Sequence, residues 1–270
     1  MSSKDKVLEF LENNKDDYIS GEAMATSLGL SRNSIWKAIN ELRKSGYNID
    51  AVSNKGYKLA DNNDILSAAG IISYLDDSLK DFYQSGDDLI RIYDNTTSTN
   101  RLAKEAAIAG AVHGTVIIAK EQTAGRGRKD HSFYSPDGGL YMSILLKPAH
   151  LTTLEPDAIT TMTGNAVCDA IETLVGVRPR IKPINDLFID NKKICGILTE
   201  AGTEFETGEV QWIVVGIGIN FDSDISAFPS DIKKTATSLF APGKSTITKN
   251  QLAAAIVNRL LGCKISRLNI

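Results

Sequence analysis

Two short turns in the second half of the chain constrain its fold more than any other feature. Asp190-Asn191 and Thr207-Gly208 separate three strand-like runs at residues 180–190, 192–201 and 210–221. Turns this short join neighbouring antiparallel strands, whereas parallel strands need a long crossover connection. The other candidate strands are residues 89–93, 115–122 and 140–147, and the candidate helices are residues 100–109, 158–174 and 250–261. We therefore predict an α+β fold in which helices pack on a mixed β-sheet.

The first 60 residues differ from the rest, because short helical patterns and turns replace the long β-branched runs. Val7, Leu8 and Phe10 belong to a first amphipathic helix. Ser20 and Gly29 mark the start and the end of a second helix, and Ser31 caps a third. The apolar positions of the third helix are Ile35, Trp36, Ile39 and Leu42.

Two short strands, residues 47–52 and 56–60, follow these helices and are joined by the turn SNKG. Three helices and a small hairpin predict a winged helix-turn-helix. We place this domain in residues 1–60, a polar linker in 61–65 and a larger domain in 66–270.

The charge balance requires any DNA contact to be local. The whole chain has a formal net charge of −3, and residues 1–60 hold nine Lys and Arg against eight Asp and Glu. Side chains suited to reading bases nevertheless begin the third helix, and a lysine at the hairpin tip could reach a phosphate. The candidate DNA-binding residues are Arg32, Asn33, Ser34, Lys37 and Lys55. A protein-interaction role for this module stays open.

Several classes of protein are disfavoured. The cysteines, Cys168, Cys195 and Cys263, form no CxxC pair, and the three histidines are scattered, so no protein-built metal site is expected. The apolar runs are strand-sized, and the N-terminus has no apolar leader segment, which predicts no membrane association and a cytoplasmic location.

The stretch GRGRKDH, residues 125–131, lies between two strands. Gly125 and Gly127 leave backbone N–H groups accessible, and Arg126 and Arg128 offer forked guanidinium donors, a combination that suits a phosphate anhydride. Neither the Walker spacing nor the dinucleotide fingerprint is present, because both need a helix after the glycines. The alternative interpretation is a solvated hairpin tip.

Two further stretches carry polar groups beside strands. The hydroxyls and amide of TTSTN, residues 96–100, suit a neutral hydrogen-bonding ligand head, although they could also cap the following helix. Lys182, Asn185, Asp186 and Lys193 come from residues 182–200, where a partly buried lysine could hold phosphate oxygens. A surface hairpin with a lysine tip is equally compatible with this pattern.

Taken in order, five motifs resemble the biotin protein ligases, in particular the bifunctional class that also represses the biotin operon. They are TSTN at 97–100, EQTAGRGR at 121–128, LYMSILL at 140–146, K-x-x-NDLFID-x-KK-x-x-GILTE at 182–200 and GIGIN at 216–220. The winged helix in front fits the repressor class. The resemblance implies a catalytic domain like those of biotin ligases and class II aminoacyl-tRNA synthetases.

The resemblance also implies roles for individual residues. The implied biotin-binding residues are Ser98, Thr99, Asn100, Gln122, Gly125, Arg126, Arg128, Lys193 and Gly196. Those implied for ATP and the adenylate are Gly127, Phe133, Lys182, Asn185 and Asn220. The implied catalytic residues are Lys193, Arg126, Arg128, Asp186 and Asn185, with Lys193 contacting the reacting carboxylate and the α-phosphate.

The implied reaction joins biotin to ATP, with Mg²⁺ carried by the nucleotide, and gives biotinyl-5′-AMP and pyrophosphate. The biotinyl group then passes to a lysine of a biotin carboxyl carrier protein, of acetyl-CoA carboxylase or another biotin-dependent carboxylase. In this family the adenylate-bound form dimerises, binds operator DNA and represses biotin genes.

Three departures from the family pattern bear on these expectations. Phe133 stands where the family has tryptophan, and Pro183 stands where a second tryptophan would line the biotin pocket. The small SH3-like domain that usually follows the catalytic domain is missing, either absent or lost by truncation. The alternative function is therefore a transcriptional regulator that binds biotin or its adenylate without efficient transfer to a carrier.

Overall fold

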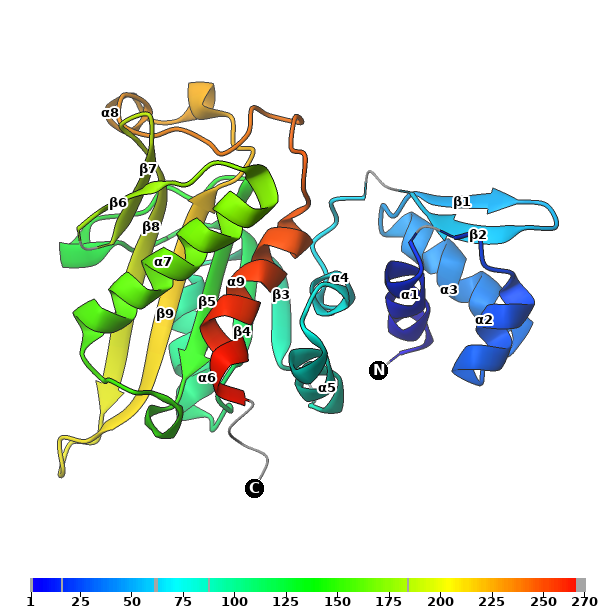
Figure 1. The fold of residues 1–270 in the computed structure, drawn as a ribbon, viewed down its shortest axis with the longest axis horizontal. Coiled ribbons are helices and arrows are strands. Elements are labelled where there is room, and N and C mark those ends of the chain that lie inside the picture. Colours follow the sequence, from blue (N-terminus) through cyan, green and yellow to red (C-terminus); the bar gives the residue numbers. More distant parts are fainter. Residues whose placement is uncertain (1, 16, 61–62, 87, 184, 266–270) are drawn as a thin grey trace. The chain divides into compact units, whose positions relative to one another are not determined.

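The computed structural model describes residues 2–15, 17–60, 63–86, 88–183 and 185–265. These residues form two compact units (Figure 1). The first unit extends to Leu75 and includes Thr248–Gln251, and the second comprises the rest of the chain. None of the helices in the described ranges is long and apolar enough to cross a bilayer.

The first unit has the predicted winged-helix architecture. Its elements are α1 (Ser3–Asn13), α2 (Gly21–Leu28), α3 (Arg32–Lys44), β1 (Ile49–Val52), β2 (Gly56–Leu59) and α4 (Ala68–Ser73). The predicted caps are present, since the Ser20 hydroxyl accepts from Ala23 N–H and the Ser31 hydroxyl accepts from Ser34 N–H. Gly29 ends α2 with φ 63°, the left-handed conformation that glycine adopts most readily.

The core of this unit explains why it continues past residue 60, where the sequence suggested a boundary. Ala69 of α4 belongs to the same buried cluster as Val7 and Leu8 of α1. The Asn250 side chain holds the same segment by two hydrogen bonds. It accepts from Ser67 N–H at 3.0 Å and donates to Ile65 C=O at 2.8 Å. We call these two hydrogen bonds the Asn250 clasp.

The second unit is built on the predicted mixed sheet. The sheet has seven strands in the order β3-β4-β5-β9-β8-β7-β6. Among the pairings between the strands described for this sheet, β3–β4 is parallel and the others are antiparallel. The strands are β3 (Ile90–Thr96), β4 (Val116–Gln122), β5 (Gly139–Leu146), β6 (Arg180–Lys182), β7 (Asp186–Ile189), β8 (Lys192–Thr203) and β9 (Val210–Asn220). The helices are α5 (Asp77–Ser85), α6 (Thr99–Ile108), α7 (Pro156–Val175), α8 (Ser230–Lys233) and α9 (Lys249–Ile265).

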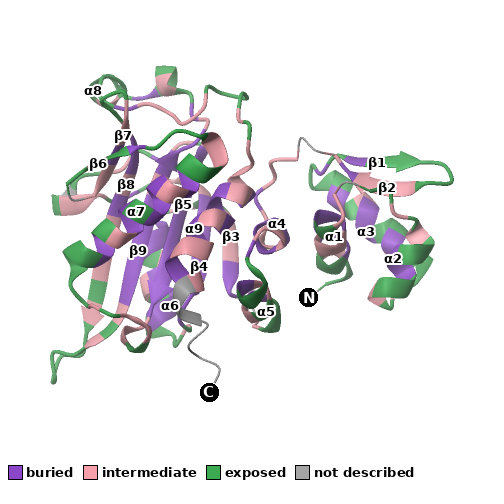
Figure 2. Cartoon of the chain, in the orientation of Figure 1, coloured by how far each residue is buried: buried purple, intermediate pink, exposed green. Residues whose placement is uncertain are grey.

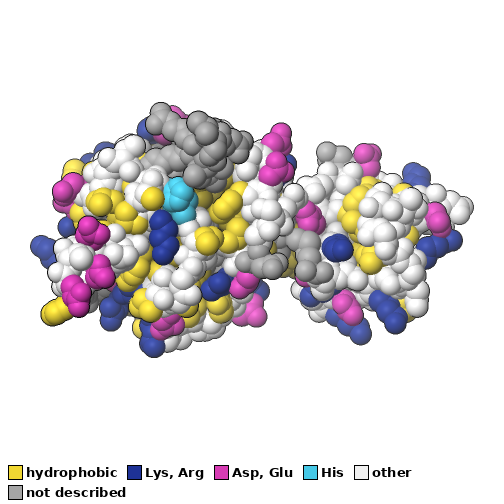
Figure 3. Space-filling view, turned by 90° about the horizontal axis from the view of Figure 1, so that it is seen from below, with side chains coloured by type: hydrophobic (Ala, Val, Ile, Leu, Met, Phe, Trp, Pro, Cys, Tyr) yellow, Lys and Arg dark blue, Asp and Glu magenta, His cyan; other side chains and the backbone are white. Residues whose placement is uncertain are grey.

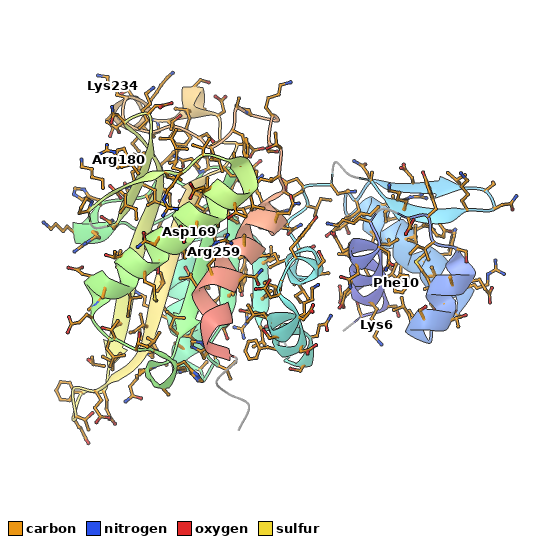
Figure 4. The ribbon with its side chains drawn as sticks, viewed as in Figure 1. Lys6, Phe10, Asp169, Arg180, Lys234 and Arg259 are labelled. Atoms are coloured by element: carbon orange, nitrogen blue, oxygen red, sulfur yellow. The ribbon has the colours of Figure 1, made fainter. Side chains whose placement is uncertain are left out.

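Helices cover both faces of this sheet. Figure 1 shows α7 and α9 in front of the strands and α6 behind them. Arg259 on α9 donates to the Thr173 hydroxyl on α7 at 2.7 Å, and Figure 4 shows Arg259 beside α7. The central strands and the inward sides of the helices are buried (Figure 2), whereas charged side chains of both signs are interspersed on the surface seen in Figure 3.

One predicted strand is wrong in its extent. Residues 180–190 form two antiparallel strands, β6 and β7, with Lys182 opposite Asp186 in the register. Pro183 follows β6 directly, and proline has no N–H to donate to a sheet ladder, so the run is interrupted there.

Candidate active site

A cavity of about 250 Å³ opens on the α6 face of the sheet. This size approaches the roughly 300–1,000 Å³ of typical sites for small organic ligands. The lining residues are Ser98, Thr99, Asn100, Gln122, Arg126, Gly127, Arg128, His131, Ser132, Phe133, Asn185, Asp186, Lys193, Gly196, Ile197, Leu198, Gly216, Ile217 and Gly218.

Strand alternation forms the floor of this cavity. In β8 and β9, Gly196, Gly216 and Gly218 alternate with isoleucines, and Gly196 pairs with Gly218 across the two strands. Successive side chains of a strand point to opposite faces, so the glycines leave the α6 face open while Ile217 and its equivalents are buried on the other face. The GIGIN motif therefore provides space on one side and core on the other.

The polar corner of the cavity is formed where two parallel strands end. Thr96 at the end of β3 is in register with Gln122 at the end of β4, so the residues after β3 lie beside Gln122. Gln122 Oε1 accepts from Thr99 N–H at 2.8 Å, and Gln122 Nε2 donates to the Ser135 hydroxyl at 2.9 Å. The backbone of Ser98 caps α6, but its hydroxyl makes no capping hydrogen bond and faces the cavity.

Behind this corner lies a buried network that the sequence analysis missed. The Ser143 hydroxyl, which is fully buried, lies 2.6 Å from Asn100 Oδ1 and 2.8 Å from Thr99 Oγ1. Asn100 Nδ2 donates to Glu200 Oε2 at 2.8 Å, and Lys104 Nζ pairs with Glu200 Oε1 at 2.7 Å. This network fixes the side chains that face the cavity.

The charge of Glu200 is maintained by its partners. Burial alone would raise the pKa of this carboxyl, but hydrogen bonds from Lys104 and Asn100 outweigh burial and hold the pKa below its ordinary value. Glu200 is therefore an ionised acceptor for Asn100 at neutral pH. In the sequence it ends the GILTE motif, and it lies on β8 an even number of residues after Gly196, so on the same face.

The Gly-Arg loop folds over the cavity as an irregular hairpin. We call residues 123–134 the flap. Gly127 N–H donates to His131 C=O at 2.7 Å, and Phe133 N–H donates to Gly125 C=O at 2.9 Å. Arg126 and Arg128 both line the cavity, and Arg128 Nη2 also lies 3.6 Å from Asp157 Oδ1 on α7. The flap thus brings both guanidinium groups to the same space as Gln122.

Phe133 at the base of the flap lies over the glycine floor. A Cβ at Gly218 would lie 2.6 Å from its ring, and one at Gly196 would lie 2.9 Å from it. The Lys193 ammonium is 5.6 Å from the ring centroid, within the range of a cation–π contact. The aromatic side chain therefore connects the floor to the charged end of the cavity.

Lys193 and Asp186 form that charged end. Lys193 Nζ lies 2.7 Å from Asp186 Oδ1, with 30% and 27% of the two side chains exposed. The backbone of Lys193 is held on both sides, because its N–H donates to Thr235 C=O and its C=O accepts from Thr237 N–H, both at 2.8 Å. Asn185 lies beside this pair and bonds to Ile197 of β8 through its backbone and its side chain.

Comparisons with known proteins agree with this arrangement. Residues 92–220 match the Biotin/lipoate A/B protein ligase family, and residues 4–58 match an HTH domain. The chain is 35% identical to the bifunctional ligase/repressor BirA of Bacillus subtilis (strain 168), over 95% of this chain and 75% of that protein. It is 31% identical to BirA of Escherichia coli (strain K12), over 80% of this chain and 62% of the relative.

The chain belongs to the biotin protein ligase family, in its bifunctional ligase/repressor branch. The fold agrees with solved members. The biotin protein ligase from Aquifex aeolicus, in complex with biotin and ATP, superposes with a TM-score of 0.55 at 26% identity and covers 66% of this chain and 71% of its own. The Leishmania major ligase, in complex with biotinyl-5-AMP, gives a TM-score of 0.54 at 26% identity, over 66% and 75% of the two chains.

Three residues expected at the site of this biotin protein ligase do not line the main cavity. Gly125 lines a neighbouring hollow formed by the flap, the start of α7 and β8, and a Cβ there would be 2.3 Å from Phe133 C=O. Lys182 is exposed on β6, with its ammonium 5.5 Å from the Phe188 ring centroid. Asn220 is buried at the end of β9 and donates to Thr237 C=O at 3.0 Å.

Seven lining residues were not among the predicted site residues. His131 and Ser132 belong to the flap, and the others lie on β8 and β9, where the glycines leave space and Leu198 is on the cavity face. The seven are His131, Ser132, Ile197, Leu198, Gly216, Ile217 and Gly218. Strand alternation from Gly196 would have identified those on the cavity face.

The predicted DNA-binding residues lie together on the first unit. Arg32, Asn33 and Lys37 are exposed on the first turns of α3, and Lys55 is exposed at the turn between β1 and β2. Ser34 is half-buried and its hydroxyl lies 2.8 Å from that of Ser31, so it serves the start of the helix. Trp36 is not part of the apolar face as its spacing suggested, because 57% of it is exposed.

Proposed function

We propose that the chain activates biotin with ATP, transfers the biotinyl group to a lysine of a biotin carboxyl carrier protein, and represses biotin genes through its winged helix. The observation that carries the ligase proposal is the single cavity. A hydroxyl and amide corner, two flap guanidinium groups and the Lys193–Asp186 pair line it together. Solved relatives hold biotin with ATP, or biotinyl-5-AMP, on the same fold.

The two ends of the cavity suit the two ends of the first substrate. Ser98, Thr99 and Asn100 present hydrogen-bonding groups to the neutral ureido ring of biotin, and the glycine floor and Phe133 accommodate its apolar body. The biotin carboxylate then lies toward Lys193 and the flap arginines. These cations offset the repulsion between the biotin carboxylate and the phosphates of ATP.

In the first half-reaction a carboxylate oxygen of biotin attacks the α-phosphorus of ATP. A P–O bond forms there as the bond to the β-phosphate oxygen breaks, and pyrophosphate leaves. The ammonium of Lys193 donates to the reacting carboxylate and α-phosphate oxygens and stabilises the charge that gathers on them. Asp186 keeps that ammonium oriented from 2.7 Å away.

Magnesium fits this donor set as an ion carried by ATP. The lining residues include one carboxylate, Asp186, and Mg²⁺ is commonly held by one or two carboxylates together with substrate phosphates. Within the described ranges no group of three or more His, Cys, Asp or Glu side chains could hold a metal by itself. When bound, the ion would neutralise phosphate charge, with Asp186 as its protein ligand.

In the second half-reaction the neutral amine of the acceptor lysine attacks the carbonyl carbon of the adenylate. The C–N bond forms, the C–O bond to AMP breaks and the amine gives up a proton. The flap and Phe133 exclude water from the anhydride until the carrier arrives. Pro183, which stands where the family has a tryptophan, is not among the described residues that line the cavity.

The repressor activity belongs to the first unit. α3 enters the major groove of the operator, and Lys55 of the wing contacts a phosphate. The adenylate-bound protein forms a homodimer in the cytoplasm and places two winged helices on a palindromic site.

One assay tests the ligase proposal. The protein is incubated with biotin, MgATP and a carrier domain, and both released pyrophosphate and biotinylated carrier are measured. We expect both products in equal amounts. Pyrophosphate without labelled carrier would instead identify a regulator that forms the adenylate. The absence of both products would refute the proposal.

A further inference from the structure

Helix α3 has two opposite faces with different chemistry. Ile35, Ala38, Ile39 and Leu42 are buried and pack in the core of the first unit. The other face repeats at the same helical spacing and points away from that core. Its members are Asn33, Trp36, Lys37, Asn40 and Lys44.

The position of Trp36 on this second face is unusual. Exposed large apolar side chains are tolerated singly, but a tryptophan with 57% of its surface exposed leaves a large apolar area in water. Among the described residues of the first unit, the other exposed large apolar side chains are Tyr18 at 38% and Val52 at 40%. Trp36 also lines a surface hollow, together with Lys37, Asn40, Glu41, Arg43 and Lys44.

The charge around Trp36 indicates the kind of partner. α3 carries four cations (Arg32, Lys37, Arg43 and Lys44) against one carboxylate, Glu41, in a chain whose net charge is −3. Arg32 is 3.2 Å from Glu22 and Arg43 donates to Ile49 C=O, whereas Lys37 and Lys44 line the hollow with Trp36. Lysines and amides on one helix face suit phosphates and base edges.

We propose that Trp36 determines operator specificity by packing its indole against the 5-methyl group of a thymine in the major groove. The thymine methyl is the apolar group that a base pair presents there, and apolar side chains recognise it by contact. Lys37 and Lys44 hold the helix by phosphate contacts. This assignment rests on the proposed repressor function and adds a base preference to it.

The test begins with a duplex that the protein itself selects. The full chain, with biotin and MgATP, enriches duplexes from a random-sequence pool, and the best duplex is then made with each thymine replaced singly by deoxyuridine. This change removes one methyl group and leaves base pairing intact. We expect at least one replacement in each half-site to weaken binding about fourfold, the factor that corresponds to about 0.8 kcal/mol for one buried methyl-sized group.

Variants then connect the methyl to the indole. Trp36→Ala should bind the unmodified duplex more weakly and should bind the thymine and deoxyuridine duplexes equally, whereas Trp36→Phe should keep part of the difference. Lys37→Ala is the matched control on the same face. It should weaken both duplexes by the same factor and reduce the salt dependence of binding, as expected for a lost phosphate contact. Circular dichroism confirms that each variant is folded.

The outcomes separate the inference from the function on which it rests. If the wild-type protein enriches no sequence, the repressor proposal fails. If it enriches a sequence but no deoxyuridine replacement matters, or Trp36→Ala is as sensitive as the wild type, then the role of Trp36 is wrong and the repressor proposal stands. Loss of self-association in Trp36→Ala, with unchanged methyl sensitivity, would identify the indole as a protein contact and also overturn the inference.

Discussion

At one end of the cavity Thr99 and Asn100 are buried and held by Gln122 and Ser143, whereas at the other end Lys193 and Asp186 each keep more than a quarter of their side chains exposed. The first end is fixed by side-chain hydrogen bonds before any ligand binds. The second is held by the backbone hydrogen bonds of Lys193 and by the pair between its ammonium and Asp186. We therefore expect substitutions to separate biotin recognition from adenylate formation.

The largest expected effect is at the charged end. Lys193→Ala should slow adenylate formation at least tenfold, because a donor to the charge that develops in the transition state is lost. Biotin affinity should change much less, since the corner around Thr99 is intact. Single-turnover release of pyrophosphate and biotin titration measure the two quantities. An unchanged rate would contradict the role given to Lys193.

The next effect is at the recognition end. A Cβ at Gly216 would lie 2.0 Å from Asn100 Oδ1, so Gly216→Ala should displace Asn100 and weaken biotin binding at least tenfold. Isothermal titration measures this affinity. Gly164→Ala is the matched control, because its nearest neighbour would be 3.6 Å away and alanine favours the helix α7. Equal losses in both variants would show that general destabilisation, not the corner, is responsible.

A smaller effect should follow the charge behind the corner. Glu200→Gln should lower the free energy of unfolding by about 1–2 kcal/mol at pH 7, because hydrogen bonds to a charged acceptor are weakened. The pKa of Glu200 is held below its ordinary value, so the stabilisation is complete above the unfolded pKa. It is lost as the pH falls through the folded value. Urea denaturation from pH 7 to pH 3.5 should therefore show the two proteins converging in acid, and a constant difference would contradict this.

The smallest effect is expected on the flap. Arg128 and Asp157 are both exposed and 3.6 Å apart, and such pairs contribute little to stability. Asp157→Ala should change the free energy of unfolding by less than about 0.5 kcal/mol. A larger change, measured by the same denaturation, would mean that the flap is anchored to α7 and not loosely held.

Much of this arrangement could be predicted from local signals. Ser20, Ser31 and Gly29 mark helix ends because capping depends on neighbouring residues alone. The two hairpin turns predict the antiparallel part of the sheet for the same reason. The motifs also predict one shared cavity for Ser98–Asn100, Gln122, the flap and Lys193. Each of them lies at or beside the end of a strand of the same sheet.

The remaining features depend on contacts between distant residues. Ser143 and Glu200 gain their roles only when β5 and β8 place them behind Asn100. Trp36 is apolar and close in spacing to the core residues of α3, but one position along a helix is a turn of about 100°, enough to expose it. The interruption of the strand at Pro183 is also predictable from the sequence, because proline has no N–H to donate to a sheet.

The Asn250 clasp has a consequence for the design of truncated fragments. A fragment ending at residue 75 would keep Ser67 and Ile65 but lack Asn250, whose side chain satisfies Ser67 N–H and Ile65 C=O. Those two backbone groups would have to find water or another partner. Weak operator binding by such a fragment would then reflect incomplete folding of its C-terminal segment. The two activities are better separated by substitutions that inactivate the catalytic site in the full-length chain.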